Sequence, residues 1–241
     1  MLTKTRAIAL HHIKYSDTSV ILTAYTEAFG RLSFMLQGIR RKNSKMNLNL
    51  FQPLFLTELE VYHKEQRELQ KIREATNAYP FQSIPYDYRK RTIALFIAEV
   101  LYKSLQEEEF NPELFGFLFN HIKMLDLKEE GIGNFHLYFL VHLTKYLGFF
   151  PQNNYTASLP FFDMQNGKFT ALKPVHNHYL EPPNSEHLHE LLKASGKQHQ
   201  DLRINRENRL QILHGLLDFY YLHNPGMGHI KSFEILKETF R

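Results

Sequence analysis

The sequence predicts an α+β protein in which an N-terminal five-stranded β-barrel precedes a mostly helical domain. Before residue 80, apolar residues recur with the two-residue period of half-buried strands, most clearly over residues 55–62. After Pro80 and Pro85 they recur at helical spacing instead. The 241-residue chain is 43% hydrophobic, so it is long enough for two domains and apolar enough to bury a core.

The barrel is expected within residues 1–80. Five β-rich runs predict its strands, at residues 6–13, 18–26, 32–36, 55–62 and 69–75. The second and third runs are joined by residues 27–30, where Gly30 is available for the positive φ of a hairpin turn. Five short strands without a long amphipathic helix favour a closed or nearly closed barrel, for which the OB-fold is the five-stranded candidate.

The helical domain is expected within residues 81–241. Asn111 and Pro112 are typical of the N-cap and first position of a helix, and Gly148 of a helix C-terminus. Residues 149–183 hold five prolines and little periodicity, which predicts an irregular excursion with a short hairpin within residues 161–169. Six helices are expected, at residues 89–106, 111–125, 134–147, 185–194, 205–223 and 232–240.

Composition bounds the class of protein. No apolar run approaches the length of a membrane-spanning helix, and the N-terminus lacks the features of a signal peptide. We therefore expect a cytoplasmic protein. The absence of cysteine excludes disulfides, thiolate nucleophiles and cysteine-based zinc sites.

The basic excess lies in the first third of the chain. Residues 1–80 hold twelve Lys and Arg against seven Asp and Glu, whereas the remainder holds 17 against 18. Between Glu27 and Glu58 there is no acidic residue, and five basic ones fall in this stretch: Arg31, Arg40, Arg41, Lys42 and Lys45. A local field of one sign attracts phosphate chains, although a solvated basic loop is the alternative.

Catalytic and metal-binding motifs are missing. The chain has no phosphate-binding glycine loop, no nucleophile elbow and no His-Glu-x-x-His pair. Among its 14 histidines, His176 and His178 lie in the excursion, while His187 and His189 would point apart on a helix. We expect a protein that is not an enzyme and that has no cofactor and no metal.

The predicted barrel interleaves basic and aromatic residues, as in proteins that hold single strands in a basic groove with stacking rings. Its aromatic residues are equally typical of a barrel core, so the charges carry the prediction. The residues expected to bind DNA are Lys14, Arg31, Arg40, Arg41, Lys42, Lys45, Arg67, Lys71 and Arg73.

The order of several motifs resembles the RecO family of bacterial recombination mediators. In the barrel the resemblance rests on residues 15–26, on the turn at 29–32, on the loop at 37–45 and on the Gln-Pro-Leu run at 52–54. In the helical part it rests on residues 111–115, 146–151 and 230–233. No single motif is decisive, but their order and spacing are specific and cover essentially the whole chain.

Two departures from the family pattern bear on function. Gln37 stands where the family usually has lysine, which removes one phosphate contact from the loop. Many relatives carry a four-cysteine zinc ribbon where this chain has residues 149–183. Because cysteine is absent and His176 and His178 could supply only two ligands, we expect the excursion to pack without zinc.

The resemblance implies an N-terminal OB-fold, a helical C-terminal domain and binding to single- and double-stranded DNA. RecO-like proteins act with RecR, remodel DNA coated by single-stranded-DNA-binding protein (SSB), anneal complementary strands and help to load RecA, which implies association with the nucleoid. They also bind the acidic, phenylalanine-ended tail of SSB. From helix phase we expect a pocket for this tail at Leu101, Lys103, Phe115, Phe119, Lys123, Leu143 and Lys145.

Two other functions remain open from the sequence. One is a protein-interaction adaptor for RecR-like or SSB-like partners, with DNA contact secondary. The other is a nuclease, which would show metal-dependent cleavage of DNA. Neutralising the loop at Arg40, Arg41 and Lys42 would separate the first alternative from a DNA-binding mediator.

Overall fold

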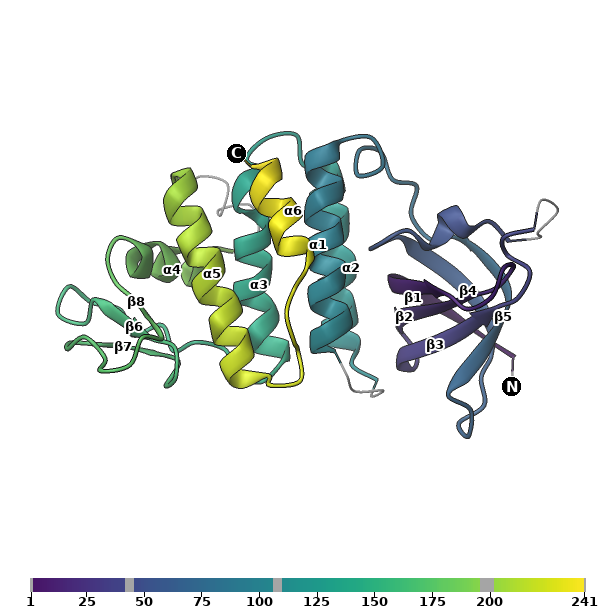
Figure 1. The fold of residues 1–241 in the computed structure, drawn as a ribbon, viewed down its shortest axis with the longest axis horizontal. Helices are drawn as coiled ribbons and strands as arrows, with labels where there is room; N and C mark the ends of the chain where they lie inside the picture. Colours follow the sequence, from purple (N-terminus) through teal and green to yellow (C-terminus); the bar gives the residue numbers. More distant parts are fainter. Residues whose placement is uncertain (1, 42–45, 106–109, 196–201, 241) are drawn as a thin grey trace. The chain divides into compact units, whose positions relative to one another are not determined.

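The computed structural model describes residues 2–41, 46–105, 110–195 and 202–240 (Figure 1). Its internal contacts divide the chain into two compact units, Met1–Leu127 and Lys128–Arg241. The first unit contains the β-barrel and two helices, and the second contains the remaining helices and a small sheet. The functional boundary expected after residue 80 stays a prediction.

A closed five-stranded barrel forms the N-terminal part of the first unit. Neighbouring strands follow the order β1-β2-β3-β5-β4, and β4 pairs again with β1. All pairs are antiparallel except β3 with β5. This confirms the predicted barrel and its five strands, which are β1 (Leu2–Lys14), β2 (Val20–Thr26), β3 (Gly30–Leu36), β4 (Leu56–Tyr62) and β5 (Leu69–Asn77).

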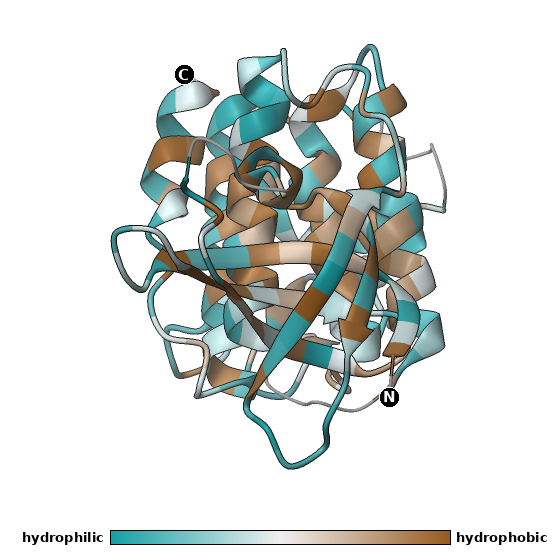
Figure 2. Ribbon diagram, turned by 90° about the vertical axis from the view of Figure 1, so that its right-hand side faces the viewer, coloured by the Kyte–Doolittle hydropathy of each residue, from teal (hydrophilic) through white to brown (hydrophobic). Residues whose placement is uncertain are grey.

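Alternating side chains explain why these segments form a barrel. Along β3, Leu32, Phe34 and Leu36 are buried, while the residues between them are partly exposed. Figure 2 shows the same change between hydrophobic and hydrophilic positions along the barrel strands. A one-residue shift in register would expose the whole inner face, so the core specifies the pairing. Gly30, with φ of +65°, closes the predicted β2–β3 turn.

Two helices follow the barrel in the first unit, α1 (Tyr88–Ser104) and α2 (Pro112–Leu127). The Asp87 side chain accepts hydrogen bonds from the first-turn N–H groups of α1. Asn111 caps α2, because its side chain accepts from the N–H of Leu114 at 2.9 Å. Helix α1 packs against β1. The expected last residue of the first helix, 106, lies outside the described residues.

The second unit confirms the remaining helices and the predicted hairpin. The hairpin joins β6 to β7 through Gly167, whose φ is +62°. A third strand, β8, extends the sheet, and the sequence missed it because β8 has only two residues. The elements of this unit are η2 (Ile132–Asn134), α3 (Phe135–Tyr146), β6 (Phe161–Asp163), β7 (Lys168–Thr170), β8 (Tyr179–Leu180), α4 (Asn184–Lys193), α5 (Arg206–His223) and α6 (Ser232–Thr239).

The small sheet occupies the place of the zinc ribbon and uses aromatic packing. Phe162 and Phe169 are buried, with ring centroids 5.1 Å apart, and Phe162 also meets Phe219 of α5 at 5.7 Å. The excursion therefore packs through its own aromatic side chains and also against α5. His176 contacts the Asp163 carboxylate at 3.2 Å, but within the described residues no three His, Cys, Asp or Glu side chains gather around one point. A zinc ion does not fit this donor set.

No helix in the described part of the chain is long and apolar enough to cross a membrane.

Candidate nucleic-acid interface

The β3–β4 connection brings two of the predicted DNA-binding residues to one end of the barrel. Ile39 is buried in the barrel core, while Arg40 and Arg41 beside it are exposed. The backbone N–H of Arg40 donates to the carbonyl of Thr18 in the β1–β2 loop at 3.3 Å. Gly38, with φ of +67°, makes the turn that precedes the arginines. The loop is thus anchored by a core side chain and directs two guanidinium groups outward.

Lys14 lies at the same end of the barrel, because β1 ends there and pairs with the first residue of β2, Val20. Its ammonium group contacts the Asp17 carboxylate at 2.9 Å, and that carboxylate is 96% exposed. A surface ion pair of this kind contributes at most about 1 kcal/mol, so Lys14 can exchange it for a phosphate. Tyr15 beside it is 64% exposed. We call Lys14, Arg40 and Arg41 the basic end.

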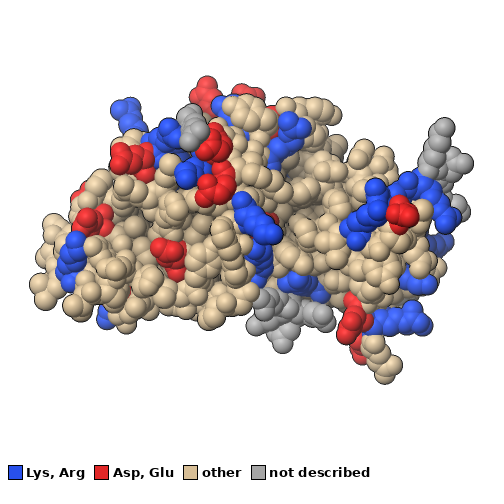
Figure 3. All heavy atoms as spheres, in the orientation of Figure 1, with Lys and Arg blue, Asp and Glu red and all other residues tan. Residues whose placement is uncertain are grey.

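Two of the predicted residues, Lys42 and Lys45, lie outside the described residues. They continue the connection that carries Arg40 and Arg41. Figure 3 shows Lys and Arg side chains gathered over the upper part of the barrel on the face in view.

Arg31 is held by helix α1. One guanidinium nitrogen donates to the carbonyl oxygens of Tyr102 and Leu105, at 2.9 and 2.6 Å, and the guanidinium carbon lies 4.8 Å from the centre of the Tyr102 ring. A cation that binds the last carbonyls of a helix stabilises its C-terminus. Arg31 also lies at the start of β3, opposite Tyr25, whereas the basic end follows Leu36 at the other end of that strand.

The other three predicted residues lie on the β4–β5 hairpin. Phe29 stacks on His63 at a centroid distance of 4.0 Å, which places the hairpin at the end of β3 remote from the basic end. Arg73 contacts Glu60 at 3.4 Å, whereas Arg67 and Lys71 are exposed. The structure therefore brings Lys14, Arg40 and Arg41 together and separates them from Arg31 and from the hairpin.

The side chains predicted to hold the SSB tail are divided between the two units. Leu101 and Leu143 are fully buried, and Phe115 is 2% exposed, so these three form part of the cores. Lys103 contacts Glu99 at 3.2 Å, and Lys145 is exposed on α3 in the second unit. The pocket stays a prediction.

Phe119 and Lys123 are the partly exposed members of the predicted pocket that contact one another. The Lys123 ammonium lies 5.8 Å from the centre of the Phe119 ring, on neighbouring turns of α2. On the barrel side, the Arg6 guanidinium lies 4.8 Å from the same ring centre. Arg6 is paired with Glu27, whose carboxylate raises the arginine pKa by accepting its hydrogen bonds, while the arginine lowers the pKa of Glu27.

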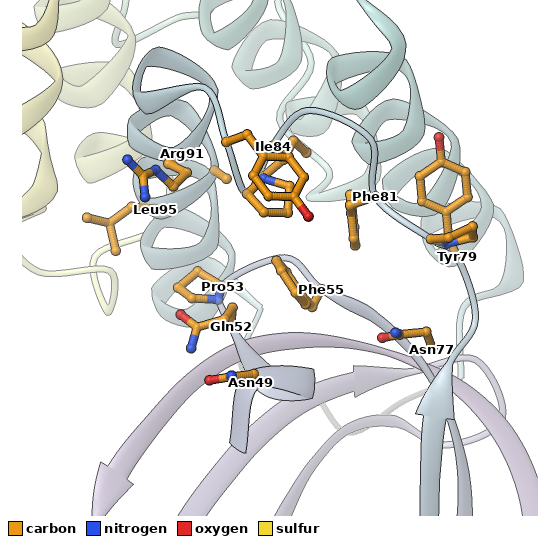
Figure 4. Close-up of a pocket in the computed structure, with 14 residues that line it drawn as sticks. Asn49, Gln52, Pro53, Phe55, Asn77, Tyr79, Phe81, Ile84, Arg91 and Leu95 are labelled. Carbon is orange, nitrogen blue, oxygen red and sulfur yellow. The ribbon is translucent and has the colours of Figure 1, made fainter. Parts of the chain in front are cut away.

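The sequence missed a groove in the first unit with a cavity volume of about 730 Å³. Figure 4 shows that its wall combines the approach to β4, the end of β5, the segment after it and the start of α1. The short helix η1 (Leu48–Phe51) contributes as well. Its lining residues are mostly aromatic, proline or amide: Asn49, Gln52, Pro53, Phe55, Asn77, Tyr79, Pro80, Phe81, Ile84, Pro85, Tyr86, Arg91, Ala94 and Leu95.

Residues 79–86 carried a signal for this groove, since three aromatic side chains and two prolines fall within eight residues. Their pattern predicts only the break between barrel and helices. Helix phase and strand period say nothing about such a segment, because it follows neither repeat.

Asp126 of α2 holds one wall of the groove in place. Its carboxylate accepts hydrogen bonds from the N–H groups of Gln82, Ser83 and Ile84 at 2.8, 2.9 and 2.8 Å. Burial alone would raise the pKa of Asp126, but these hydrogen bonds together lower it. The buried Lys90 ammonium donates to the Asp126 carbonyl at 2.8 Å and thus ties α1 to the same point.

A closed barrel with the OB strand order, a basic end and appended helices defines an OB-barrel protein with exposed cationic loops. The family model for "Recombination protein O N terminal" matches residues 1–81, and that for "Recombination protein O C terminal" matches residues 85–232. The chain belongs to the RecO family.

Curated relatives match along all or nearly all of their length. The DNA repair protein RecO of Bacteroides fragilis is 39% identical over 241 residues, and that of Phocaeicola vulgatus is 37% identical over 240, each with full coverage of both chains. The RecO protein of Flavobacterium johnsoniae is 35% identical, with 98% of each chain covered.

Proposed function

We propose that this protein is a non-catalytic DNA repair protein that binds DNA through the basic end of its barrel and acts as a recombination mediator. The observation that carries the proposal is the exposure of Lys14, Arg40 and Arg41 at one end of a closed barrel, in a chain of the RecO family. Phosphate binding by such groups releases counterions and needs neither a nucleotide nor bond cleavage. The proposed function therefore requires exposed cationic side chains and no catalytic residues.

In the mediator role, the protein works with RecR on DNA coated by SSB, anneals complementary strands and helps to load RecA. Membership of the family supports these partners. A cationic surface can compete with another protein for the DNA phosphates, which suits the exchange of one DNA-bound protein for another.

The variant Arg40→Ala/Arg41→Ala tests the DNA contact. We expect single-strand affinity to fall about tenfold at moderate salt, and the slope of log K against log salt to fall by about 1.4, since each lost phosphate contact contributes about 0.7. The control Lys168→Ala/Arg203→Ala makes the same change of charge at exposed positions of the second unit and should match the wild type.

If the double variant keeps both affinity and slope, the basic end is not the DNA contact, and the adaptor function becomes the better explanation. Annealing of complementary strands coated with SSB tests the mediator role itself, and the double variant should slow it. Cleavage of DNA by the pure protein with a divalent metal would support a nuclease instead.

For the SSB tail, we propose a site at Phe119 and Lys123. A half-buried ring beside Lys123 and Arg6 offers an apolar contact and positive charge to an acidic peptide that ends in phenylalanine. The full-length protein should be used, since α1 and α2 belong to the compact unit of the barrel. Lys123→Ala should weaken peptide binding about fivefold and Lys145→Ala should not. The reverse result would move the site to the second unit.

A further inference from the structure

We propose that the groove lined by Phe55, Phe81, Tyr86 and Arg91 binds one unstacked nucleotide of a DNA single strand, with the base against its aromatic side chains and the phosphate at Arg91. This inference rests on the proposed function, because it adds a second contact to a strand bound at the basic end. The groove has a cavity volume of about 730 Å³, within the range of about 300–1,000 Å³ that is typical of small-ligand sites.

The aromatic side chains of the groove suit a base. Phe55 and Phe81 stack on one another with centroids 4.8 Å apart, and Tyr79 meets the Phe81 ring edge-on at 5.2 Å. Tyr86 is 80% exposed, although it is a large ring at the wall of a concave surface. Its backbone is held in a turn, since its N–H donates to the carbonyl of Ser83 at 2.9 Å. An exposed aromatic ring on an anchored backbone is a surface on which a base can stack.

The polar groups of the groove suit a base edge. Asn49, Gln52 and Asn77 are exposed, and Figure 4 shows them on the barrel side of the groove. Within the described residues, these three side-chain amides make no hydrogen bond to the protein. An amide donates and accepts at once, so it can pair with a base edge that carries both a donor and an acceptor.

The charge of the groove favours a phosphate over a basic or apolar peptide. Arg91 is the lining residue with a formal charge, and none of the fourteen lining residues is Asp or Glu. Within the described residues its guanidinium forms no ion pair, whereas Arg89, two residues earlier on α1, is paired with Asp87 at 3.3 Å. A free guanidinium next to aromatic faces binds phosphate well, because its planar donors match the phosphate oxygens.

The groove also continues the basic end along the chain. One wall of the groove lies in the connection between β3 and β4, which carries Arg40 and Arg41 at its start and Asn49, Gln52 and Pro53 farther on. The opposite wall is kept in place by the hydrogen bonds of Asp126, so little ordering is needed when a ligand binds. In this proposal, a strand held by its phosphates at the basic end places one base in the groove.

The experiment compares Tyr86→Ala and Arg91→Ala with the matched controls Tyr88→Ala and Arg89→Ala. Tyr88 is 59% exposed and Arg89 is also exposed, and neither lines the groove. All four changes are at exposed side chains, so folding should survive. The probes are labelled oligothymidylate, a strand of equal length whose residues lack bases, and a duplex.

We expect Tyr86→Ala to lose about tenfold in affinity for oligothymidylate and nothing for the duplex or the strand without bases. Tyr86→Phe should restore the wild-type value, because stacking needs the ring alone. Arg91→Ala should lower the salt slope for the single strand by about 0.7. Photocrosslinking of 4-thiothymidine strands should label residues 79–86.

Equal behaviour of Tyr86→Ala and Tyr88→Ala, with crosslinks elsewhere, would overturn the inference while Arg40→Ala/Arg41→Ala could still support the proposed function. A loss of binding confined to an acidic peptide would make the groove a peptide site and overturn it as well. If the wild type binds no DNA, both the inference and the proposed function fail.

Discussion

Replacement of Asp126 by asparagine should destabilise the first unit by about 3 kcal/mol. Asp126 is 1% exposed. One carboxylate oxygen accepts from the N–H of Gln82 and the hydroxyl of Tyr79, and the other accepts from the N–H groups of Ser83 and Ile84. Both oxygens are therefore in use as acceptors.

The expected loss of stability follows from the hydrogen bonds that the asparagine side chain can accept in place of the carboxylate. If its nitrogen takes the first position, the Tyr79 hydroxyl can turn and accept, but the N–H of Gln82 loses its partner. A donor left without a partner in this part-buried position costs about 1–3 kcal/mol. The hydrogen bonds that remain pass from a charged to a neutral acceptor and weaken, by about 1 kcal/mol in total.

The effect should depend on pH. The pKa of Asp126 is lower in the folded protein than in the unfolded chain, so the carboxylate contributes stability above the unfolded value of about 3.9. That contribution is lost as the pH falls through the folded pKa. The difference between wild type and Asp126→Asn should therefore be full at pH 7 and shrink below about pH 4.

Urea unfolding and hydrogen exchange measure this effect. The urea midpoint should fall by about 1–3 M, because urea m-values are about 1–3 kcal/mol/M, and exchange should quicken first over residues 79–84. Glu129→Gln is the matched control, because it removes one exposed carboxylate nearby and should change stability by less than about 0.5 kcal/mol. A loss under 1 kcal/mol for Asp126→Asn at pH 7, or an equal loss for the control, would refute the reasoning.

Three further predictions concern other parts of the chain. Arg31→Ala should lower the stability of the first unit by about 2 kcal/mol, measured by urea unfolding, because the Arg31 guanidinium binds the end of α1. The salt slope of DNA binding should stay unchanged. A lower slope would show that Arg31 contacts DNA. Gly38→Ala should cost about 1 kcal/mol, because φ is +67°, whereas Gly116→Ala within α2, where a Cβ meets nothing within 4 Å, should stabilise by up to about 1 kcal/mol. Aromatic packing supports the small sheet, so Phe169→Ala should lower stability by about 3–5 kcal/mol. Treatment with EDTA should leave the thermal unfolding midpoint unchanged. A shift of the midpoint with EDTA would contradict the prediction that the sheet packs without a metal.

The barrel and the helices could be predicted because their signals are local. The two-residue alternation of β3 and the capping residues Asn111 and Pro112 act within a few positions of the chain, and the structure confirms the elements they predict. The two residues of β8 carry too little pattern to be recognised, because pairing with β6 alone makes them a strand.

The cationic loop of the basic end could be predicted from charge density, which can be counted from the sequence alone. Arg40 and Arg41 are exposed, as charged residues usually are. Leu101 and Leu143 were assigned to a pocket from helix phase. Phase identifies the apolar face of a helix but does not say whether another element covers it, and both side chains are buried.

The sequence by itself determined the five barrel strands, the β6–β7 hairpin and the six α-helices, together with the absence of cysteine and the stretch without acidic residues that begins before Arg31. Only the tertiary structure decided how the charges of that stretch are divided, with Arg31 on the end of α1 and Arg40 and Arg41 at the far end of β3. Only the tertiary structure joined η1, β5 and α1 around a groove. The physical reason is that composition and period act along the chain, whereas contacts between residues about 70 positions apart, such as Arg31 with Tyr102, depend on how the packed elements meet.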